Sequence, residues 1–405
     1  MKKDSGFQVI APDRKKHAEA IFDLLAKVFS QGHGYYPFYE YCRRIIPASP
    51  HFDWGTTRVG FLDGKLVTYY GIYKYTMRIG SARVLVGGVG GVATDARYRK
   101  RGLVARAAAA SIEAMRAGGY DLSHLFGIRN FYYRFGYVRS WEPTAYIVNR
   151  DELPREGPPL TLQRFEPRHR DDLARLYNRE NARITGTAVR PTYQVRLAYS
   201  LARFQGYEWR DGAGRVSGYV VLAPQENHVD VIDFAGPVEQ VLRALGVLAR
   251  RLERREVRFG GLSWEHPLCK RLRRGYCRSE ISHAGNAGPL ASLVNLPSAL
   301  RKLSSEMSGL LKASHLAGWR GELLIGGSRE KATLAINRAR VSVEPPRPSK
   351  HRLIGGDEVV RLLLGSAEPE EIIEAARMRL SGDARALCAI LFPNRRPMLS
   401  PWDGY

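Results

Sequence analysis

Hydrophobic positions in the first part of the chain alternate between the spacing of strands and the spacing of helices. A strand is expected at residues 7–10, and a helix follows Pro12 with its apolar side chains on one face. Further strands are expected, at residues 57–62, 66–78, 83–94, 122–126 and 136–148. An Ala-rich helix is expected at 102–117, where Gly118 and Gly119 end it. This pattern predicts an α/β unit over residues 1–150.

A charged linker with three prolines, residues 151–159, precedes a second run of the same kind. Its expected order is strand, helix, three strands, helix, strand, short helix and strand, which matches the order in the first unit. The predicted elements are 161–165, 168–181, 207–210, 216–223, 229–234, 238–255, 258–262, 267–274 and 279–284. The chain is therefore predicted to hold tandem α/β (α+β) domains, over 1–150 and 160–287.

A third unit is predicted over residues 292–405. Helical spacing covers 300–316, and short strands follow at 321–325, 331–336 and 341–343. Three helices are expected after the proline-rich connector, at 356–364, 369–377 and 383–391. The prolines after residue 392 exclude a regular helix at the C-terminal end.

Composition narrows the class of protein. The 405 residues are 44% hydrophobic and 25% charged, which is typical of soluble multidomain proteins. The start lacks the apolar segment of a secretory signal, and no apolar run reaches membrane-spanning length. A cytoplasmic location is expected. The four cysteines show no metal-ligand spacing, so we expect reduced thiols and no metal site.

The net charge of +23 indicates a surface that attracts phosphate groups. Two kinds of partner satisfy this, nucleic acid and a phosphate-rich cofactor. The densest basic run, residues 250–258, lies late in a predicted amphipathic helix and has no aromatic residue for base stacking. That run therefore favours a solvated helix face over a nucleic-acid site.

One segment, residues 89–104, carries the chemistry. It is predicted to be a strand, a basic loop with Arg99, Lys100 and Arg101, and a helix start at Gly102. A helix start presents unpaired N–H groups and a positive dipole end, which together bind anions. Glycine lets the backbone approach such an anion closely. The segment predicts a pyrophosphate site.

Residues 99–104 resemble motif A of the GNAT acetyltransferases, with Val104 where a small residue is usual. An aliphatic residue at that position resembles the Eis-type (enhanced intracellular survival) branch. Residues 131–137, Phe-Tyr-Tyr-Arg-Phe-Gly-Tyr, are similar to a second Eis-type motif. The tail that ends at Tyr405 and the order of three units also resemble that branch. The resemblance implies tandem GNAT-like domains followed by a sterol-carrier-like domain over 292–405.

The resemblance implies an acetyl-CoA-dependent N-acetyltransferase acting on an amine of a small molecule or of a lysine side chain. Tyr132 would protonate the leaving thiolate, and the terminal carboxylate of Tyr405 would act as base. Strand amides near the thioester and the basic helix start would hold acetyl-CoA. The expected cofactor-binding residues are Val92, Ala93, Thr94, Lys100, Arg101, Gly102, Leu103, Val104, Ala105, Gly127 and Ile128.

The remaining expectations concern partners. The second unit has an acidic segment, 233–239, where the phosphate loop would lie, so it is expected to shape the substrate pocket. Asp53, Glu180 and residues 368–371 are candidates for an acidic acceptor pocket. Family members form hexamers, so a homo-oligomer is expected, without a membrane partner. Two alternatives stay open, which are nucleic-acid binding on an idle acetyltransferase scaffold and lipid carriage by the third unit.

Overall fold

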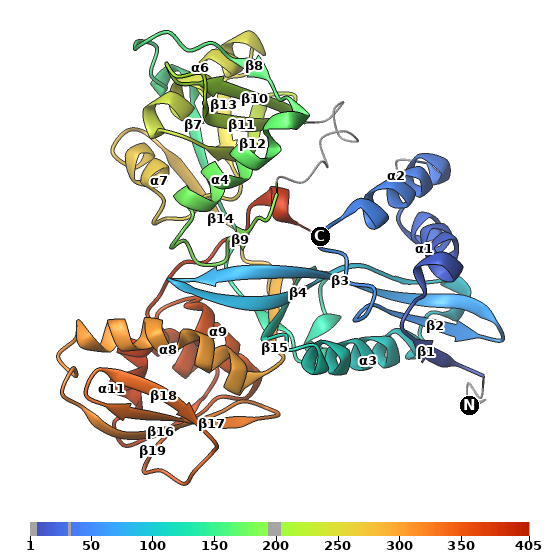
Figure 1. Cartoon of the computed structure of the whole chain (residues 1–405), viewed down its shortest axis with the longest axis vertical. Coiled ribbons are helices and arrows are strands. Elements are labelled where there is room, and N and C mark those ends of the chain that lie inside the picture. Colours follow the sequence, from blue (N-terminus) through green and yellow to red (C-terminus); the bar gives the residue numbers. More distant parts are fainter. Residues whose placement is uncertain (1–5, 31–33, 193–203, 405) are drawn as a thin grey trace.

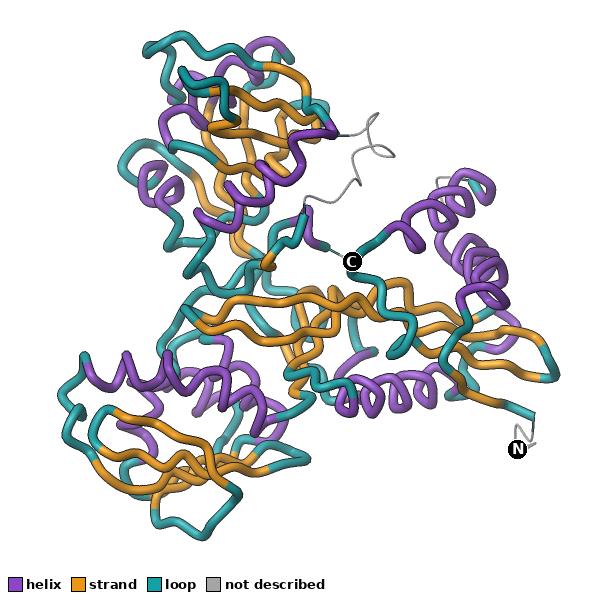
Figure 2. Tube along the Cα trace, in the orientation of Figure 1, coloured by secondary structure: helices purple, strands orange, loops and turns teal. Residues whose placement is uncertain are grey.

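The computed structural model describes residues 6–30, 34–192 and 204–404. Three separate sheets organise this part of the chain, and each has helices against it (Figure 1). The tube in Figure 2 shows that strands form the centre of each unit and that helices lie outside them. The predicted α+β class with several domains is confirmed.

The first sheet has the strand order β1-β2-β3-β4-β5-β15-β6, and β9 pairs with β3. Its long central hairpin, β3 and β4, joins at the turn between Ile79 and Ala82. Its strands are β1 (Gln8–Ile10), β2 (Arg58–Leu62), β3 (Lys65–Ile79), β4 (Ala82–Thr94), β5 (Leu122–Gly127), β6 (Val138–Arg139), β9 (Ala188–Val189) and β15 (Gly288–Leu293).

Helices cover both faces of this sheet. Helix α3 (Leu103–Ala117) lies on one face, and α1 (Arg14–Phe29) and α2 (Tyr35–Ala48) lie on the other (Figure 1). Asp13 caps α1, because its carboxylate accepts hydrogen bonds from the amides of Lys15 and Lys16 at 2.8 and 2.9 Å. Two short 3-10 helices complete the unit, η1 (Ala96–Tyr98) and η2 (Tyr132–Phe135).

The second sheet has the order β14-β7-β13-β12-β11-β10-β8. Its main core lies under α6, where alternate residues of β11 and β12 meet the apolar face of that helix. The elements are β7 (Thr144–Asn149), η3 (Arg150–Glu152), β8 (Gln163–Arg164), η4 (Pro167–His169), α4 (Arg170–Glu180), β10 (Gln205–Arg210), β11 (Val216–Pro224), β12 (His228–Ala235), α6 (Val238–Arg251), β13 (Glu256–Phe259), α7 (Pro267–Leu272) and β14 (Arg278–Ile281).

The third sheet has the order β18-β17-β16-β19-β20 and packs against α8 and α11. Two strands in it, β19 and β20, are not among the elements that the hydrophobic pattern predicts. The elements are α8 (Leu296–Lys312), β16 (Arg320–Gly326), β17 (Lys331–Asn337), β18 (Arg340–Glu344), β19 (His351–Ile354), η5 (Gly356–Glu358), α9 (Val359–Leu364), α10 (Pro369–Ala375), β20 (Arg379–Ser381) and α11 (Ala384–Leu391).

Two strands lie in a different sheet from the one that their sequence position suggests. The single strand predicted at 136–148 is wrong, since it divides into β6 in the first sheet and β7 in the second. In return β15, which follows the second unit in sequence, inserts between β5 and β6 of the first sheet. The sheets therefore cross the predicted boundaries near residues 150 and 292. The first and second sheets thus include strands from outside the predicted ranges of their units, whereas the third sheet has only strands from within 292–405.

Helix α2 is also absent from the expected elements. Its prolines, Pro37 and Pro47, lie in the first and last turns, where a missing N–H or a distorted turn costs little. In the described residues, no helix is long and apolar enough to cross a membrane.

The C-terminal tail connects the three units. Arg395 donates to Glu306 of α8 at 2.7 Å, and the amide of Met398 donates to the carbonyl of Thr185 at 3.0 Å. The tail ends in η6 (Pro401–Asp403), drawn in red in Figure 1 between the first sheet and the second unit. The buried side chain of Trp402 packs among residues of α4, β11 and β12.

Candidate active site

The basic loop predicted from the sequence joins β4 to α3. Asp95 anchors its start, since the carboxylate accepts from the amide of Arg97 and pairs with the Arg97 and Lys65 side chains at 2.9 and 3.4 Å. The hydrogen bond from Arg97 holds the pKa of Asp95 well below its ordinary value. Asp95 is therefore ionised and its charge is balanced by Arg97 and Lys65, while Arg99, Lys100 and Arg101 are exposed.

Gly102 is the N-cap residue of α3 and has a φ of +74°. That left-handed conformation favours glycine, and a Cβ built there would meet no atom within 4 Å. The amide of Ala105 already donates to the Gly102 carbonyl at 3.1 Å. The first amides of a helix, here those of Leu103 and Val104, have no acceptor within the helix.

Strands β4 and β5 separate beside this helix start. Their parallel pairing runs only from Val86–Leu122 to Gly88–His124, although β4 continues to Thr94 and β5 to Gly127. Each strand keeps its outer neighbour, β3 for β4 and β15 for β5. The inner backbone edges of Val92, Ala93, Thr94 and Gly127 therefore border a gap between the two strands.

A bulge in β4 shapes one side of that gap. The register with β3 shifts between Tyr69 and Gly71, so that Gly91 and Val92 both lie opposite one residue of β3. Gly91 has a φ of +72°, and a Cβ there would lie 3.1 Å from Leu25 of α1. A bulge bends the strand that carries it, and this one lies beyond the part of β4 that pairs with β5.

Tyr132 lies in η2, buried against the end of β5. A Cβ on Gly127 would approach the Tyr132 ring to 2.8 Å, so glycine at this position lets the ring reach the strand. The Tyr132 ring packs in the same cluster as Val89, Leu125 and α3. Burial raises the pKa of the Tyr132 hydroxyl to about 12, and nearby Tyr137 adds to the shift. The phenol is therefore protonated at neutral pH.

The opposite face of β5 borders a cavity. His124 stacks on Trp141 with ring centroids 4.6 Å apart, and burial lowers the pKa of His124 to about 3. Phe126, half exposed, lines an open cavity of about 510 Å³. The cavity is lined by all three units and the tail, including Trp141, Glu142, Trp264, His283, Glu371 and Arg396.

The acidic residues expected near an acceptor lie in different places. Asp53 accepts from the Tyr120 hydroxyl and from the amide of Gly55, which makes it a structural group. Burial raises the pKa of Glu180 to about 7, and its carboxylate accepts from the amide of Gly236 at 2.7 Å. From residues 368–371, Glu371 lines the large cavity. Glu142, which the sequence did not single out, lines it too.

The structure gathers most of the predicted cofactor residues in one place. Val92, Ala93 and Thr94 end β4, Gly127 ends β5, and Ile128 follows it with 66% of its surface exposed. Lys100, Arg101 and Gly102 lead into Leu103, Val104 and Ala105 in the first turn of α3. Tyr405 lies outside the described residues, which end at Gly404.

Residues 10–139 match the family model described as an acetyltransferase (GNAT) domain. The match contains the separated strands, the basic loop and Tyr132. The N-terminal third of the chain is a GNAT acetyltransferase domain. This domain supports N-acetyl transfer as the activity, and a GNAT domain implies acetyl-CoA as the co-substrate.

Solved structures share the fold of the whole chain. A GCN5-related N-acetyltransferase from Anabaena variabilis is 14% identical with a TM-score of 0.76, covering 98% of this chain and 100% of its own. A probable N-acyltransferase from Enterococcus faecalis is 16% identical with a TM-score of 0.78, covering 98% and 99%. Eis1 from Mycobacterium abscessus is 16% identical with a TM-score of 0.69, covering 98% and 100%. No curated protein matches the chain.

Proposed function

We propose that this GNAT enzyme is of the Eis type and transfers an acetyl group from acetyl-CoA to an amine of a small molecule or of a lysine side chain. One observation supports this most directly, which is the gap between β4 and β5 with the helix start of α3 at one end and Tyr132 at the other. The fold shared with Eis1 over 98% of the chain supports the assignment to this branch.

Acetyl-CoA fits the residues that border this gap. The space beside Gly102 admits a pyrophosphate, which the amides of Leu103 and Val104 and the charges of Lys100 and Arg101 would bind. The inner edges of Val92, Ala93, Thr94 and Gly127 would hold the extended arm that leads to the thioester. The exposed side chain of Ile128 would cover that arm.

Transfer forms a bond between the amine nitrogen and the acetyl carbon and breaks the bond between that carbon and sulfur. The departing thiolate needs a proton, and Tyr132 is a proton donor that packs against the end of β5. A hydroxyl with a pKa near 12 stays protonated at neutral pH, so it can donate a proton to the sulfur as the bond between carbon and sulfur breaks. Tyr132 would thus act as the general acid.

The amine must lose a proton, and the terminal carboxylate of Tyr405 is the proposed acceptor of it. The docking of the tail through Trp402 and Asp403 supports this role, because a free chain end normally frays. Both residues are buried between the first sheet and the second unit. In this proposal the third unit is a sterol-carrier-like scaffold that delivers the tail, in a cytoplasmic homo-oligomer.

The acceptor amine would approach from the face of β5 that carries Phe126. The cavity there combines the aromatic rings of Phe126, Trp141 and Trp264 with Glu142 and Glu371. Arg139 pairs with Glu142 at 2.9 Å, and Arg396 also lines the cavity. Because these charges largely balance, the cavity favours an amine with an apolar or aromatic body over a polycation.

The test is release of free thiol from acetyl-CoA by the purified full chain, measured with a panel of aryl-alkyl amines, polyamines and lysine peptides. Amine-dependent thiol release is expected to be highest with the aryl-alkyl amines. Tyr132→Phe serves as the matched inactive control. The absence of amine-dependent release, together with salt-sensitive retention on DNA, would instead favour the nucleic-acid alternative.

A further inference from the structure

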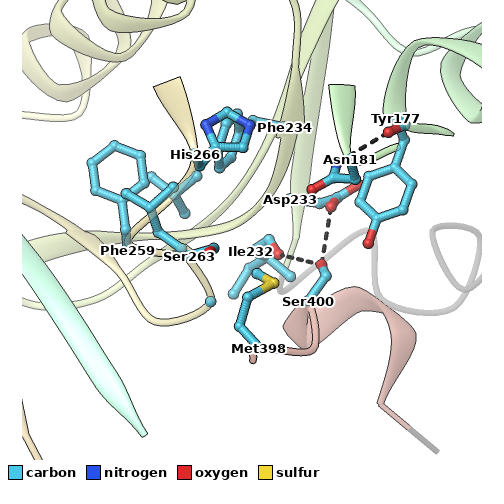
Figure 3. Close-up of a pocket in the computed structure, with 13 residues that line it drawn as sticks. Tyr177, Asn181, Ile232, Asp233, Phe234, Phe259, Ser263, His266, Met398 and Ser400 are labelled. Atoms are coloured by element: carbon cyan, nitrogen blue, oxygen red, sulfur yellow. Dashed lines mark hydrogen bonds between the residues drawn. The ribbon is translucent and has the colours of Figure 1, made fainter. Parts of the chain in front are cut away.

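A cluster of charged side chains is buried where the tail meets the first two units. Arg190, just after β9, lies between Asp233 of β12 and Asp403 of η6, and each of these three side chains is 2% exposed. Figure 3 shows Tyr177 beside the tail helix and Asp233 pointing to Ser400. The mechanism proposed above uses the docking of Asp403 but gives no role to Arg190 or Asp233.

Every donor of the Arg190 guanidinium is engaged. It donates to both oxygens of Asp233 at 2.7 and 3.0 Å and to both oxygens of Asp403 at 2.8 and 2.9 Å. The remaining N–H donates to the Tyr219 hydroxyl at 3.3 Å. An arginine has five such donors, so this geometry forms two forked ion pairs on one side chain.

Other groups complete the cluster around the tail. The Tyr177 hydroxyl donates to Asp403 at 3.1 Å, and the Ser400 hydroxyl donates to Asp233 at 3.0 Å. The guanidinium of Arg78, on β3 of the first sheet, is also buried and donates to the side chain of Asn178 at 2.8 Å. Asn178 in turn accepts from the amide of Arg190 at 3.0 Å.

The charges in this cluster balance across three parts of the chain. Arg78 belongs to the first unit, Arg190 and Asp233 to the connection and sheet of the second, and Asp403 to the tail. Buried ion pairs contribute little net stability, because removing charges from water costs about as much as their attraction returns. The hydrogen bonds in these ion pairs are directional, so they hold the side chains in one arrangement. Here they hold Asp403, and with it the last residues of the tail.

We infer that Arg190 is a positioning residue that locks the C-terminal tail through Asp403 and so sets where the terminal carboxylate lies. The expected effect on turnover rests on the proposed role of that carboxylate as base. The holding of the tail by Arg190 does not depend on that role. Only two residues, Gly404 and Tyr405, lie between the locked side chain and the chain end, so a released Asp403 would free the carboxylate.

The test uses two variants of the full chain, Arg190→Lys and Asp403→Asn. Lysine keeps the positive charge, but its three N–H donors share one nitrogen, so it cannot form bidentate hydrogen bonds to two carboxylates. Asparagine keeps the shape of Asp403 and removes its charge, which provides the milder change if the lysine variant folds poorly. Leu245→Ala, in the core under α6 and not in contact with the tail, is the control for general destabilisation.

The first readout is digestion by a carboxypeptidase well below the melting temperature, followed by mass spectrometry. Trimming of the wild type should stop before buried Trp402, whereas both variants should be trimmed past it at least about tenfold faster. The second readout is kinetic, in which kcat should fall at least about tenfold in the variants while the KM for acetyl-CoA stays unchanged.

Each outcome separates the lock from the catalytic proposal. Trimming as slow as in the wild type, in folded variants, would overturn the inference, as would equally fast trimming of Leu245→Ala. Fast trimming with reduced kcat supports the lock and the terminal base together. Fast trimming with normal kcat supports the lock and refutes the terminal carboxylate as base.

Discussion

The assignment of the pyrophosphate site to the start of α3 can be tested with a pair of glycines on the same helix. Gly102 precedes α3 and Gly119 follows it, and both have a φ of +74°. A Cβ added at either position would meet no atom within 4 Å. The variants Gly102→Phe and Gly119→Phe therefore impose the same positive φ on phenylalanine, and the Cβ atom of each has room in the folded chain.

The two variants should lose similar amounts of stability. Forcing a residue other than glycine into the left-handed region costs about 1–2 kcal/mol, which corresponds to a decrease of several degrees in melting temperature at most. Because the added Cβ atoms meet no neighbouring atom, we expect no loss of packing to add to this cost. The melting temperatures of the two variants should therefore agree closely.

Their affinities for acetyl-CoA should differ strongly. At Gly102 the new side chain occupies the space in which the phosphates would lie, and two hydrogen bonds to charged oxygens are lost at about 1.5–3 kcal/mol each. That loss amounts to about 10²- to 10⁴-fold in Kd. At Gly119 the side chain lies at the far end of the helix, so the Kd should stay within about twofold of the wild type.

Isothermal titration of acetyl-CoA into each purified variant measures the Kd, and thermal unfolding without ligand measures the strain. The reasoning fails if Gly102→Phe, folded and melting like Gly119→Phe, binds acetyl-CoA as tightly as the wild type. It fails equally if Gly119→Phe weakens binding to the same degree, because the helix start would then have no special role.

Three further predictions concern the acid, the chain end and a buried carboxyl. Tyr132→Phe should lower kcat by about 10²-fold with little change in the Kd for acetyl-CoA. The kcat of the wild type should not decline up to pH 10, because the Tyr132 hydroxyl, with its pKa of about 12, stays protonated. A decline in kcat near pH 8 would show that another group is the acid. Three residues added after Tyr405, or deletion of Tyr405, should abolish most of the turnover while acetyl-CoA still binds; equal activity of a C-terminally tagged enzyme would require a different base. Glu180 has a pKa raised by burial from 4.5 to about 7, so the unfolded state releases its proton first and stability falls as pH rises from about 4.5 to 7. Glu180→Gln should remove this loss and raise the free energy of unfolding by about 3 kcal/mol at pH 8 but not at pH 4; a variant less stable than the wild type at pH 8 would contradict the burial argument.

Part of the site could be predicted from the sequence because its signals are local. A strand, a basic loop and a glycine at a helix start lie within sixteen residues, 89–104, and local geometry places them together wherever the unit folds. The segment around Tyr132 is equally compact, and Gly127 lies only five positions before it. Hydrophobic spacing likewise predicted α1, α3, α4 and α6, since each buries one apolar face.

Tertiary structure alone decided which strand completes which sheet. Strands β7 and β15 have ordinary apolar patterns, and such a pattern does not predict which strand will pair with them. The place of β15 in the first sheet depends on backbone pairing with β5, whose partner residues lie 161 to 171 positions earlier in the chain. Because the sequence does not reveal this pairing, the boundaries predicted near residues 150 and 292 placed β15 outside the first unit.

The buried charges show the same limit most clearly. In the sequence Arg190 and Asp403 are single charged residues in a chain with 63 basic and 40 acidic residues, and such residues normally face water. Only the folded chain brings them within 2.8 Å of each other and removes them from solvent, across 213 positions of sequence. Short segments of the sequence thus predict the cofactor site, whereas the position of the C-terminal tail depends on contacts that exist only after folding.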